Sequence, residues 1–285
     1  YNSLFGTHKS KLIKYTPVYN TNVYLNMFTK RKEVIFAVMI SIFSTLIIFN
    51  GVLQKKIISN NDQLFNFEPW VHNYGNQGTE NNYILSDMID GVGSIFTQQK
   101  ILKKGQIPIW DYSDKLGNFG VINILNNWFY PIRTISWLLF DIPFGWTIDI
   151  LLKFNIGFIF LYLYLRKIGL NFSASIVTCI GFTFGSNNIS EALAGFSTVP
   201  LTIPVTLYYA EKLIQSNKWK DSIYFTLSLI LLAGAGFVSI SFFSICWIAL
   251  YLIYRVITSA DRFSLICKIV ISCIFSILIF LFALL

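Results

Sequence analysis

Charged residues are scarce in this sequence. They make up 13% of its 285 residues, whereas soluble domains typically carry about 25%. Hydrophobic residues make up 54% of the chain, and several apolar runs approach the roughly 20 residues that a helix needs to cross a bilayer. The composition therefore excludes an ordinary soluble domain and predicts an all-α, multi-spanning membrane protein. The formal net charge of +8 does not indicate a nucleic-acid partner, because the basic residues lie beside apolar runs, where they set orientation.

Histidine and cysteine are also rare, with two and four copies. None of the cysteines has metal-ligand spacing with another cysteine or a histidine, and His72 stands alone in its region, so no zinc site is predicted. We expect the cysteines, which lie in or beside apolar runs, to be small buried hydrophobic residues: Cys179, Cys246, Cys267 and Cys273. No nucleophile elbow, P-loop or dinucleotide-binding motif is present.

The apolar runs divide the chain into parts. We expect residues 1–26, which are polar and aperiodic, to be an extension outside the fold, and 27–53 to hold the first transmembrane helix. Residues 54–145 are predicted to be a large loop outside the cytoplasm, and 146–285 to hold six further transmembrane helices. Because the chain stops inside an apolar run, we interpret it as the N-terminal part of a longer protein. The predicted spans are 34–53, 146–165, 172–190, 197–213, 221–235, 237–254 and 264–285.

The short turns differ in charge. Those near 187–196 and 234–236 hold no Lys or Arg, whereas the alternate turns hold Arg166, Lys167, Lys212, Lys218, Lys220, Arg255, Arg262 and Lys268. The positive-inside rule then predicts a multi-pass protein of the plasma membrane with its N-terminus inside. A span at 128–141 would reverse every later turn, so we expect that aromatic segment to lie at the membrane interface. The outer loop is expected to form two short helices joined by the turn-rich region 105–120, and the first of them covers roughly 87–104.

Few polar residues stand out as candidates for chemistry. Asp62 and Asp87 lie in the predicted outer loop, where a carboxylate can act as a general base for a hydroxyl or help to hold a divalent cation. Lys153 lies inside a predicted span, which makes it a functional candidate, although it could pair with Asp149 or extend to the surface. Arg133 could bind a phosphate or anchor the interfacial segment.

The loop motifs, in their order, resemble the YfhO family of the GT-C glycosyltransferase group. The stretches that carry the resemblance cover most of residues 34–256: "NDQLFNFEPW", "ILSD", "ILKKGQIPIWD", "LGNFG", "NNWFYP", "LYLYLRKIGL", "GFTFGSN" and "VPLTIPVTLYYAEKL". The resemblance implies a helical bundle of GT-C type with a large first extracytoplasmic loop that contains short interfacial helices. It implies that Asp62 and Asp87 are catalytic, and that Gly105, Pro108, Trp110 and Gly117 shape the loop.

The family implies transfer of a sugar from a polyprenyl-phosphate-linked donor to a glycan or other envelope polymer. In that reaction Lys153 and Arg133 would bind the donor phosphate. A divalent cation is compatible with the loop carboxylates, but the sequence does not fix a cofactor. Two other functions stay open: a transporter or flippase of lipid-linked sugars, and a non-catalytic membrane protein that assembles the envelope.

Overall fold

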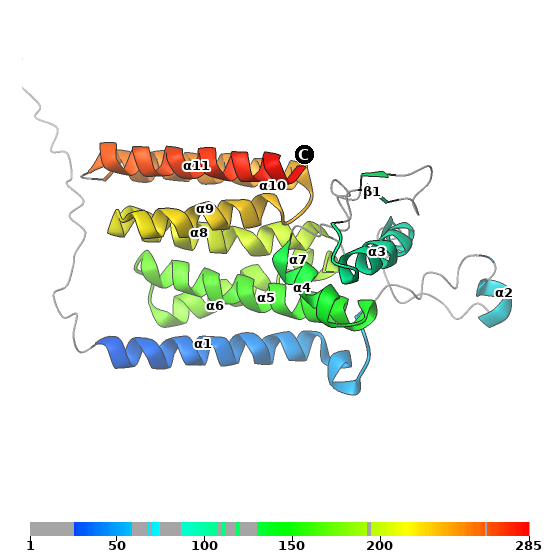
Figure 1. Cartoon of the computed structure of the whole chain (residues 1–285). Helices are drawn as coiled ribbons and strands as arrows, with labels where there is room; N and C mark the ends of the chain where they lie inside the picture. The colour runs from blue at the N-terminus through cyan, green and yellow to red at the C-terminus, as the bar shows by residue number, and fades with distance from the viewer. Residues whose placement is uncertain are drawn as a thin grey trace, which may run out of the picture.

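The computed structural model describes residues 26–58, 68, 70–74, 87–107, 110–111, 118–119, 130–192, 195–259 and 261–284. Long helices run side by side in alternating directions and form a bundle (Figure 1). The bundle helices are α1 (Asn26–Ile48), α5 (Ile142–Lys167), α6 (Phe172–Thr183), α8 (Thr198–Ser216), α9 (Trp219–Ala233), α10 (Val238–Ile257) and α11 (Arg262–Leu284).

Among the described residues, three helices are long and apolar enough to cross a membrane: Ile142–Lys167, Ser239–Ile257 and Arg262–Ile279. The last two carry large apolar side chains on their outer faces, with Trp247 72% and Phe263 80% exposed. A surface of that kind is stable against lipid but costly against water. The predicted class, an all-α membrane protein, is therefore confirmed.

Helices occupy the segments in which the sequence predicts spans, but one of those segments is interrupted. The predicted span 172–190 breaks into α6 and a short helix, α7 (Ser186–Ser190). The chain leaves the helix at Phe184 and Gly185, where the polar "GSNN" stretch favours a turn. Asn188 stabilises the break, because its Nδ2 donates to the carbonyl oxygen of Phe182 over 2.8 Å.

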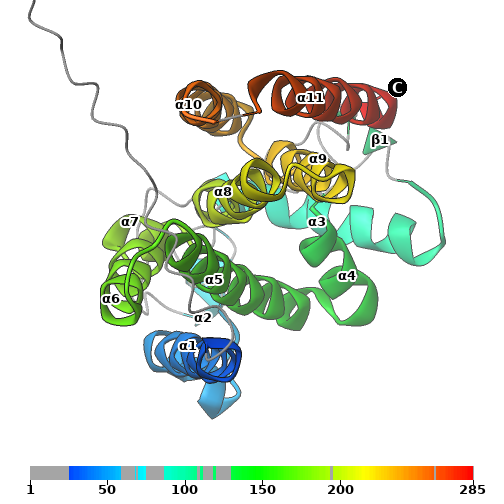
Figure 2. The same ribbon diagram turned by 90° about the vertical axis from the view of Figure 1, so that its left-hand side faces the viewer.

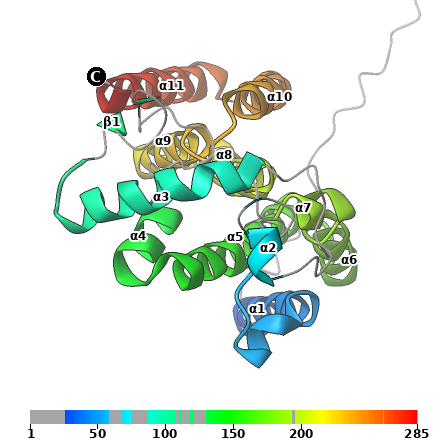
Figure 3. The same cartoon turned by 90° about the vertical axis from the view of Figure 1, so that its right-hand side faces the viewer.

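One end of the bundle is covered by a layer that we call the roof, made of α3 (Asp87–Lys103) and α4 (Pro131–Leu139) (Figure 3). α3 confirms the helix predicted at 87–104. The side chain of Gln99 joins the two helices, because its Nε2 donates to the carbonyl oxygens of Trp137 and Phe140 over 2.8 and 2.9 Å. These carbonyls belong to the last turn of α4, so α3 satisfies acceptors that α4 itself leaves open.

The interfacial segment does not cross the bundle. α4 has nine residues, which at about 1.5 Å per residue reach less than half of the roughly 30 Å hydrocarbon core. Its first residue is Pro131, whose fixed φ suits the first turn of a helix. Arg133, Ser136 and Trp137 form its buried face, at a helical spacing of three and four residues. The prediction that 128–141 does not span agrees with this geometry.

The end of the bundle opposite the roof, which we call the basic end, collects cationic side chains. α1 begins there, α5, α8 and α10 end there, and α9 and α11 begin there (Figure 1). Its basic residues at these helix ends are Arg31, Lys32, Arg166, Lys167, Lys212, Lys218, Lys220, Arg255, Arg262 and Lys268.

α5 is the central helix, with α1, α4, α6 and α8 around it (Figure 2). Small residues allow this close packing. A Cβ on Gly157 would lie 3.0 Å from both Cδ2 and the carbonyl oxygen of Leu201 on α8. Ala37, Ser41 and Thr45 are buried at a spacing of four residues on α1, and Ser41 Oγ donates to Oδ1 of Asn155 over 2.7 Å. Small and hydroxyl-bearing residues commonly line helix contacts inside membranes.

We predict that Gly157→Val destabilises the bundle by about 1–3 kcal/mol, because the added atoms overlap Leu201 and force α5 and α8 apart. Thermal unfolding of the purified protein in detergent measures the effect. Gly181→Ala is the matched control, because a Cβ at Gly181 on α6 meets nothing within 4 Å. That variant should unfold at the wild-type temperature or slightly above it. Equal melting temperatures for Gly157→Val and wild type would contradict the packing.

Candidate functional site

A buried ionic cluster lies where the roof meets the central helix. Arg133 of α4 and Asp149 of α5 form an ion pair, with 3.0 Å between Nε and Oδ2 and side-chain exposures of 5% and 1%. Lys153 lies one turn further along α5 and is 1% exposed. Its Nζ donates to the carbonyl oxygen of Ala192 over 2.6 Å. We call Arg133, Asp149 and Lys153 the roof cluster.

The local sequence explains how these side chains meet. Asp149 and Lys153 are four residues apart, so they share one face of α5. A tight turn at Phe140 and Asp141 folds α4 back against α5. Gly145 permits that approach, because a Cβ there would lie 2.9 Å from the carbonyl oxygen of Ser136. The buried face of α4 then places Arg133 against Asp149.

Aromatic and hydroxyl groups surround the ion pair. The guanidinium carbon of Arg133 lies 5.9 Å from the ring centre of Trp137, within cation–π range. Tyr130, directly before α4, is buried and shares a side-chain hydrogen bond with Thr202 of α8. Burial holds the pKa of Tyr130 well above its usual value, so its hydroxyl keeps its proton.

Among the described residues, the roof cluster brings two basic side chains together with one carboxylate. Buried ions are costly unless they are paired, and membrane interiors raise that cost. Asp149 Oδ1 and the hydroxyls of Ser197 and Thr198 have no hydrogen-bond partner among the described residues. A bound anion would lower the free energy of this arrangement by neutralising the second cation. A phosphate suits it, because guanidinium and ammonium groups are its usual protein partners.

The sequence left open whether Lys153 and Arg133 are functional residues or only a paired charge and a surface anchor, and the structure shows where each side chain lies. Asp149 pairs with Arg133 rather than with Lys153, although the sequence places Asp149 and Lys153 at pairing distance along the helix. Lys153 does not extend to the surface, because it is buried among helix contacts. Arg133 is not a surface anchor, because it lies on the inner face of α4. The structure thus brings together both predicted phosphate-binding residues, with an aspartate between them.

The other predicted residues are placed only in part. Asp62, Pro108 and Gly117 lie outside the described residues. Asp87 is the first residue of α3, but the described part does not include its side chain. No position of these side chains relative to the roof cluster is therefore assigned.

Gly105 and Trp110 follow α3. Gly105 ends the helix in the left-handed region, with φ +74°. Gln106 N donates to the carbonyl oxygen of Ile101 and Gly105 N to that of Leu102, which is the Schellman pattern. Trp110 starts β1 (Trp110–Asp111), which pairs antiparallel with β2 (Asn118–Phe119). Gly105 therefore ends α3 and Trp110 begins a two-residue strand, and the loop-shaping role of these residues stays a prediction.

The sequence did not reveal a second buried ionic group, near the basic end. Glu211 of α8 is fully buried. Its Oε2 accepts from Nη2 of Arg255 over 2.9 Å, and the hydroxyl of Tyr251 donates to its Oε1. The sequence held one signal for this group: Tyr251 and Arg255 are four residues apart and therefore share one face of α10, where both can reach the same partner. Within the described residues, no three His, Cys, Asp or Glu side chains lie close enough together to hold a metal ion.

Comparison with known proteins adds no family to this picture. No family model matches the chain, and no curated protein or solved structure shows significant similarity to it.

We predict that Asp149→Leu costs about 3–5 kcal/mol of stability, because it leaves buried Arg133 without its counter-ion. Combining it with Arg133→Met should recover most of that loss, since the pair is then replaced by apolar side chains. Unfolding in a mixed-detergent titration measures both variants. The control is Asp141→Asn, because Asp141 is exposed and its side chain makes no capping hydrogen bond. A double variant as unstable as Asp149→Leu alone would show that the ion pair does not account for the loss.

Proposed function

We propose that the protein is a membrane glycosyltransferase of GT-C type that uses a polyprenyl-phosphate-linked sugar as donor. The observation that carries the proposal is that two buried basic side chains, Arg133 and Lys153, belong to one cluster at the roof. A lipid-linked donor presents a phosphate at membrane depth. In this cluster Arg133 lies on the inner face of the roof helix α4, and Lys153 lies on α5, a helix long enough to cross the membrane. The acceptor is a glycan or another polymer of the cell envelope.

The proposed orientation follows from the basic end. Cationic side chains gather where α1 begins, so the positive-inside rule places that end in the cytoplasm and the roof outside it. The protein then crosses the plasma membrane several times with its N-terminus inside. In this orientation the roof is part of a large outer loop, and the acceptor arrives from the water side.

The reaction is a substitution at the anomeric carbon of the donor sugar. An acceptor hydroxyl oxygen attacks that carbon, the bond from the carbon to the phosphate oxygen breaks, and the phosphate leaves with the electron pair. Asp62 or Asp87 takes the hydroxyl proton as general base. Arg133 and Lys153 stabilise the negative charge that grows on the leaving phosphate. Because both cations are buried, the roof has to shift before the phosphate reaches them.

A transporter or flippase of lipid-linked sugars is the second candidate. The break between α6 and α7 favours it, because interrupted helices often line substrate sites in transporters. Lys153 binds the carbonyl oxygen of Ala192, shortly after that break. A flippase would move the lipid-linked sugar across the bilayer without breaking the bond between sugar and phosphate, so an assay of transfer separates the two functions.

We predict that Asp62→Asn or Asp87→Asn lowers sugar transfer by about 10²–10⁴, the usual cost of losing a general base. Lys153→Met should raise KM for the donor and lower kcat, because the ammonium contacts the phosphate both before and after the bond breaks. The assay uses the full-length protein in liposomes with a radiolabelled polyprenyl-phosphate sugar.

Two variants control for loop charge and for overall charge. Asp111→Asn changes the residue of β1 next to Trp110, and Lys100→Met removes an exposed cation from α3 at the same end of the bundle. Both should retain near wild-type turnover at equal membrane levels. Full transfer by Asp62→Asn, Asp87→Asn and Lys153→Met would exclude these catalytic roles. Movement of intact donor without transfer would instead favour the flippase.

A further inference from the structure

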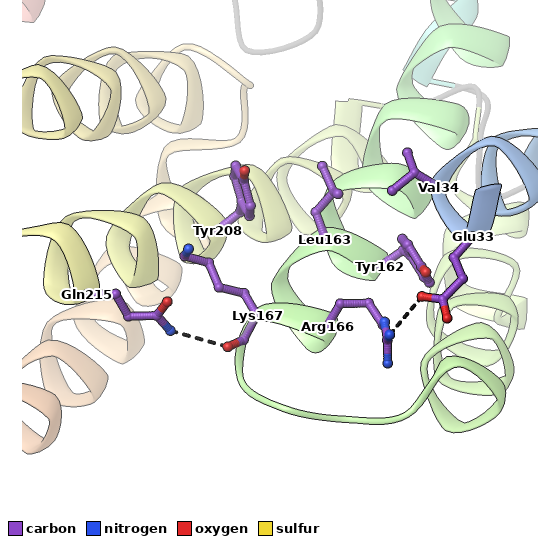
Figure 4. Close-up of a pocket in the computed structure, with 8 residues that line it drawn as sticks. All are labelled: Glu33, Val34, Tyr162, Leu163, Arg166, Lys167, Tyr208 and Gln215. Atoms are coloured by element: carbon purple, nitrogen blue, oxygen red, sulfur yellow. Dashed lines mark hydrogen bonds and ion pairs between the residues drawn. The ribbon is translucent and has the colours of Figure 1, made fainter. Parts of the chain in front are cut away.

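A second candidate site lies at the basic end, far from the roof. A cleft of about 350 Å³ opens there between α1, α5 and α8, a size at the lower end of the ~300–1,000 Å³ range of small-molecule sites (Figure 4). Its polar lining comes from all three helices: Glu33 from α1, Tyr162, Arg166 and Lys167 from α5, and Tyr208 and Gln215 from α8.

The cleft carries more positive than negative charge. Arg166 Nη2 lies 2.7 Å from Oε2 of Glu33, and its Nη1 donates to the carbonyl oxygen of Leu170 over 2.7 Å. These two contacts hold the guanidinium at the α1 side of the cleft. Lys167 extends the other way, toward Tyr208 (Figure 4). Two cations therefore flank the opening, and Glu33 is the one carboxylate among the residues that line the cleft. Asp221 of α9 also interacts electrostatically with Lys167.

We propose that this cleft binds the phosphate of an anionic phospholipid. Lipid phosphate is the anion most concentrated at the level where membrane helices end, and basic pockets between such helices recognise lipid headgroups. Lys167 contributes a point charge to the phosphate. Arg166, which has five N–H donors, contributes a directed hydrogen bond while it keeps Glu33 and Leu170.

The surroundings suit a lipid rather than a water-soluble anion. Val34 and Leu163 add apolar surface to the cleft. On α1, Ile35, Phe36 and Met39 follow Glu33 and are exposed, so acyl chains have an apolar surface beside the headgroup. Glu33 lowers the affinity of the cleft for a phosphate, because its carboxylate repels the phosphate and occupies one donor of Arg166. This site does not depend on the proposed sugar transfer, because it lies at the other end of the bundle.

The test measures lipid binding to the full-length protein in detergent by native mass spectrometry, with phosphatidylglycerol as the probe and phosphatidylcholine as the neutral reference. Lys167→Gln should weaken phosphatidylglycerol binding about fivefold, the effect of one lysine near a lipid surface. Glu33→Gln should strengthen it, since a competing carboxylate is lost. Lys220→Gln is the matched control, because Lys220 is exposed at the same end but does not line the cleft.

Each alternative has its own outcome. An equal loss in Lys167→Gln and Lys220→Gln would show a general charge effect and overturn the site. Weaker binding in Glu33→Gln would show that Glu33 supports the cleft rather than competing with the ligand, which also contradicts the proposal. Loss of the bound lipid on adding inorganic phosphate would identify a site for free phosphate instead of a lipid. The proposal is supported if phosphatidylglycerol stays bound when inorganic phosphate is added, and if Lys167→Gln weakens lipid binding while Glu33→Gln strengthens it.

Discussion

The ion pair between Arg133 and Asp149 joins the short helix α4 to the central helix α5, and the position of the roof depends on it. α4 has only nine residues and would not be a stable helix alone in water. It is held by one ionic contact below and by Gln99 of α3 above. The same ion pair engages Asp149, which is the one carboxylate that the described residues contribute to the cluster beside Lys153. A structural contact thereby produces the electrostatic condition on which the proposed function rests.

The two ends of the bundle use charge in different ways. At the roof, the described residues place two buried basic side chains beside one buried carboxylate. At the basic end, Glu211 is fully buried and is matched by Arg255 and Tyr251, so α10 is tied to α8 with its charge balanced. Of these two buried ionic groups, the roof cluster is the one with a physical reason to bind an anion. The balanced one explains how α10, whose outer face is largely exposed, stays attached to the bundle.

Much of the fold could be predicted from the sequence, because apolar runs of sufficient length determine where membrane helices form. The short helix α3 was also predictable, from its partial helical periodicity, whereas Pro131 interrupts an apolar run in the sequence and begins α4 in the structure. The pairing of Arg133 with Asp149 was not, because it requires α4 to fold back on α5, and no local pattern specifies that contact. The break after α6 was missed because the predicted span 172–190 was continued across the polar "GSNN" stretch, whose turn residues interrupt the helix at Gly185.

The sequence singled out Lys153 and Arg133 one at a time, as costly charges in apolar surroundings, but not their arrangement. In the structure Arg133 pairs with Asp149, one helical turn from Lys153 on α5, and phosphate binding stays a prediction. The central claim is that this cluster binds the phosphate of a lipid-linked donor. A density map of the full-length protein in nanodiscs that contain a polyprenyl monophosphate tests it most directly. The account predicts phosphate density within hydrogen-bond distance of Lys153 and Arg133, with the roof displaced. An unchanged, closed cluster, with the lipid phosphate bound elsewhere, would contradict it.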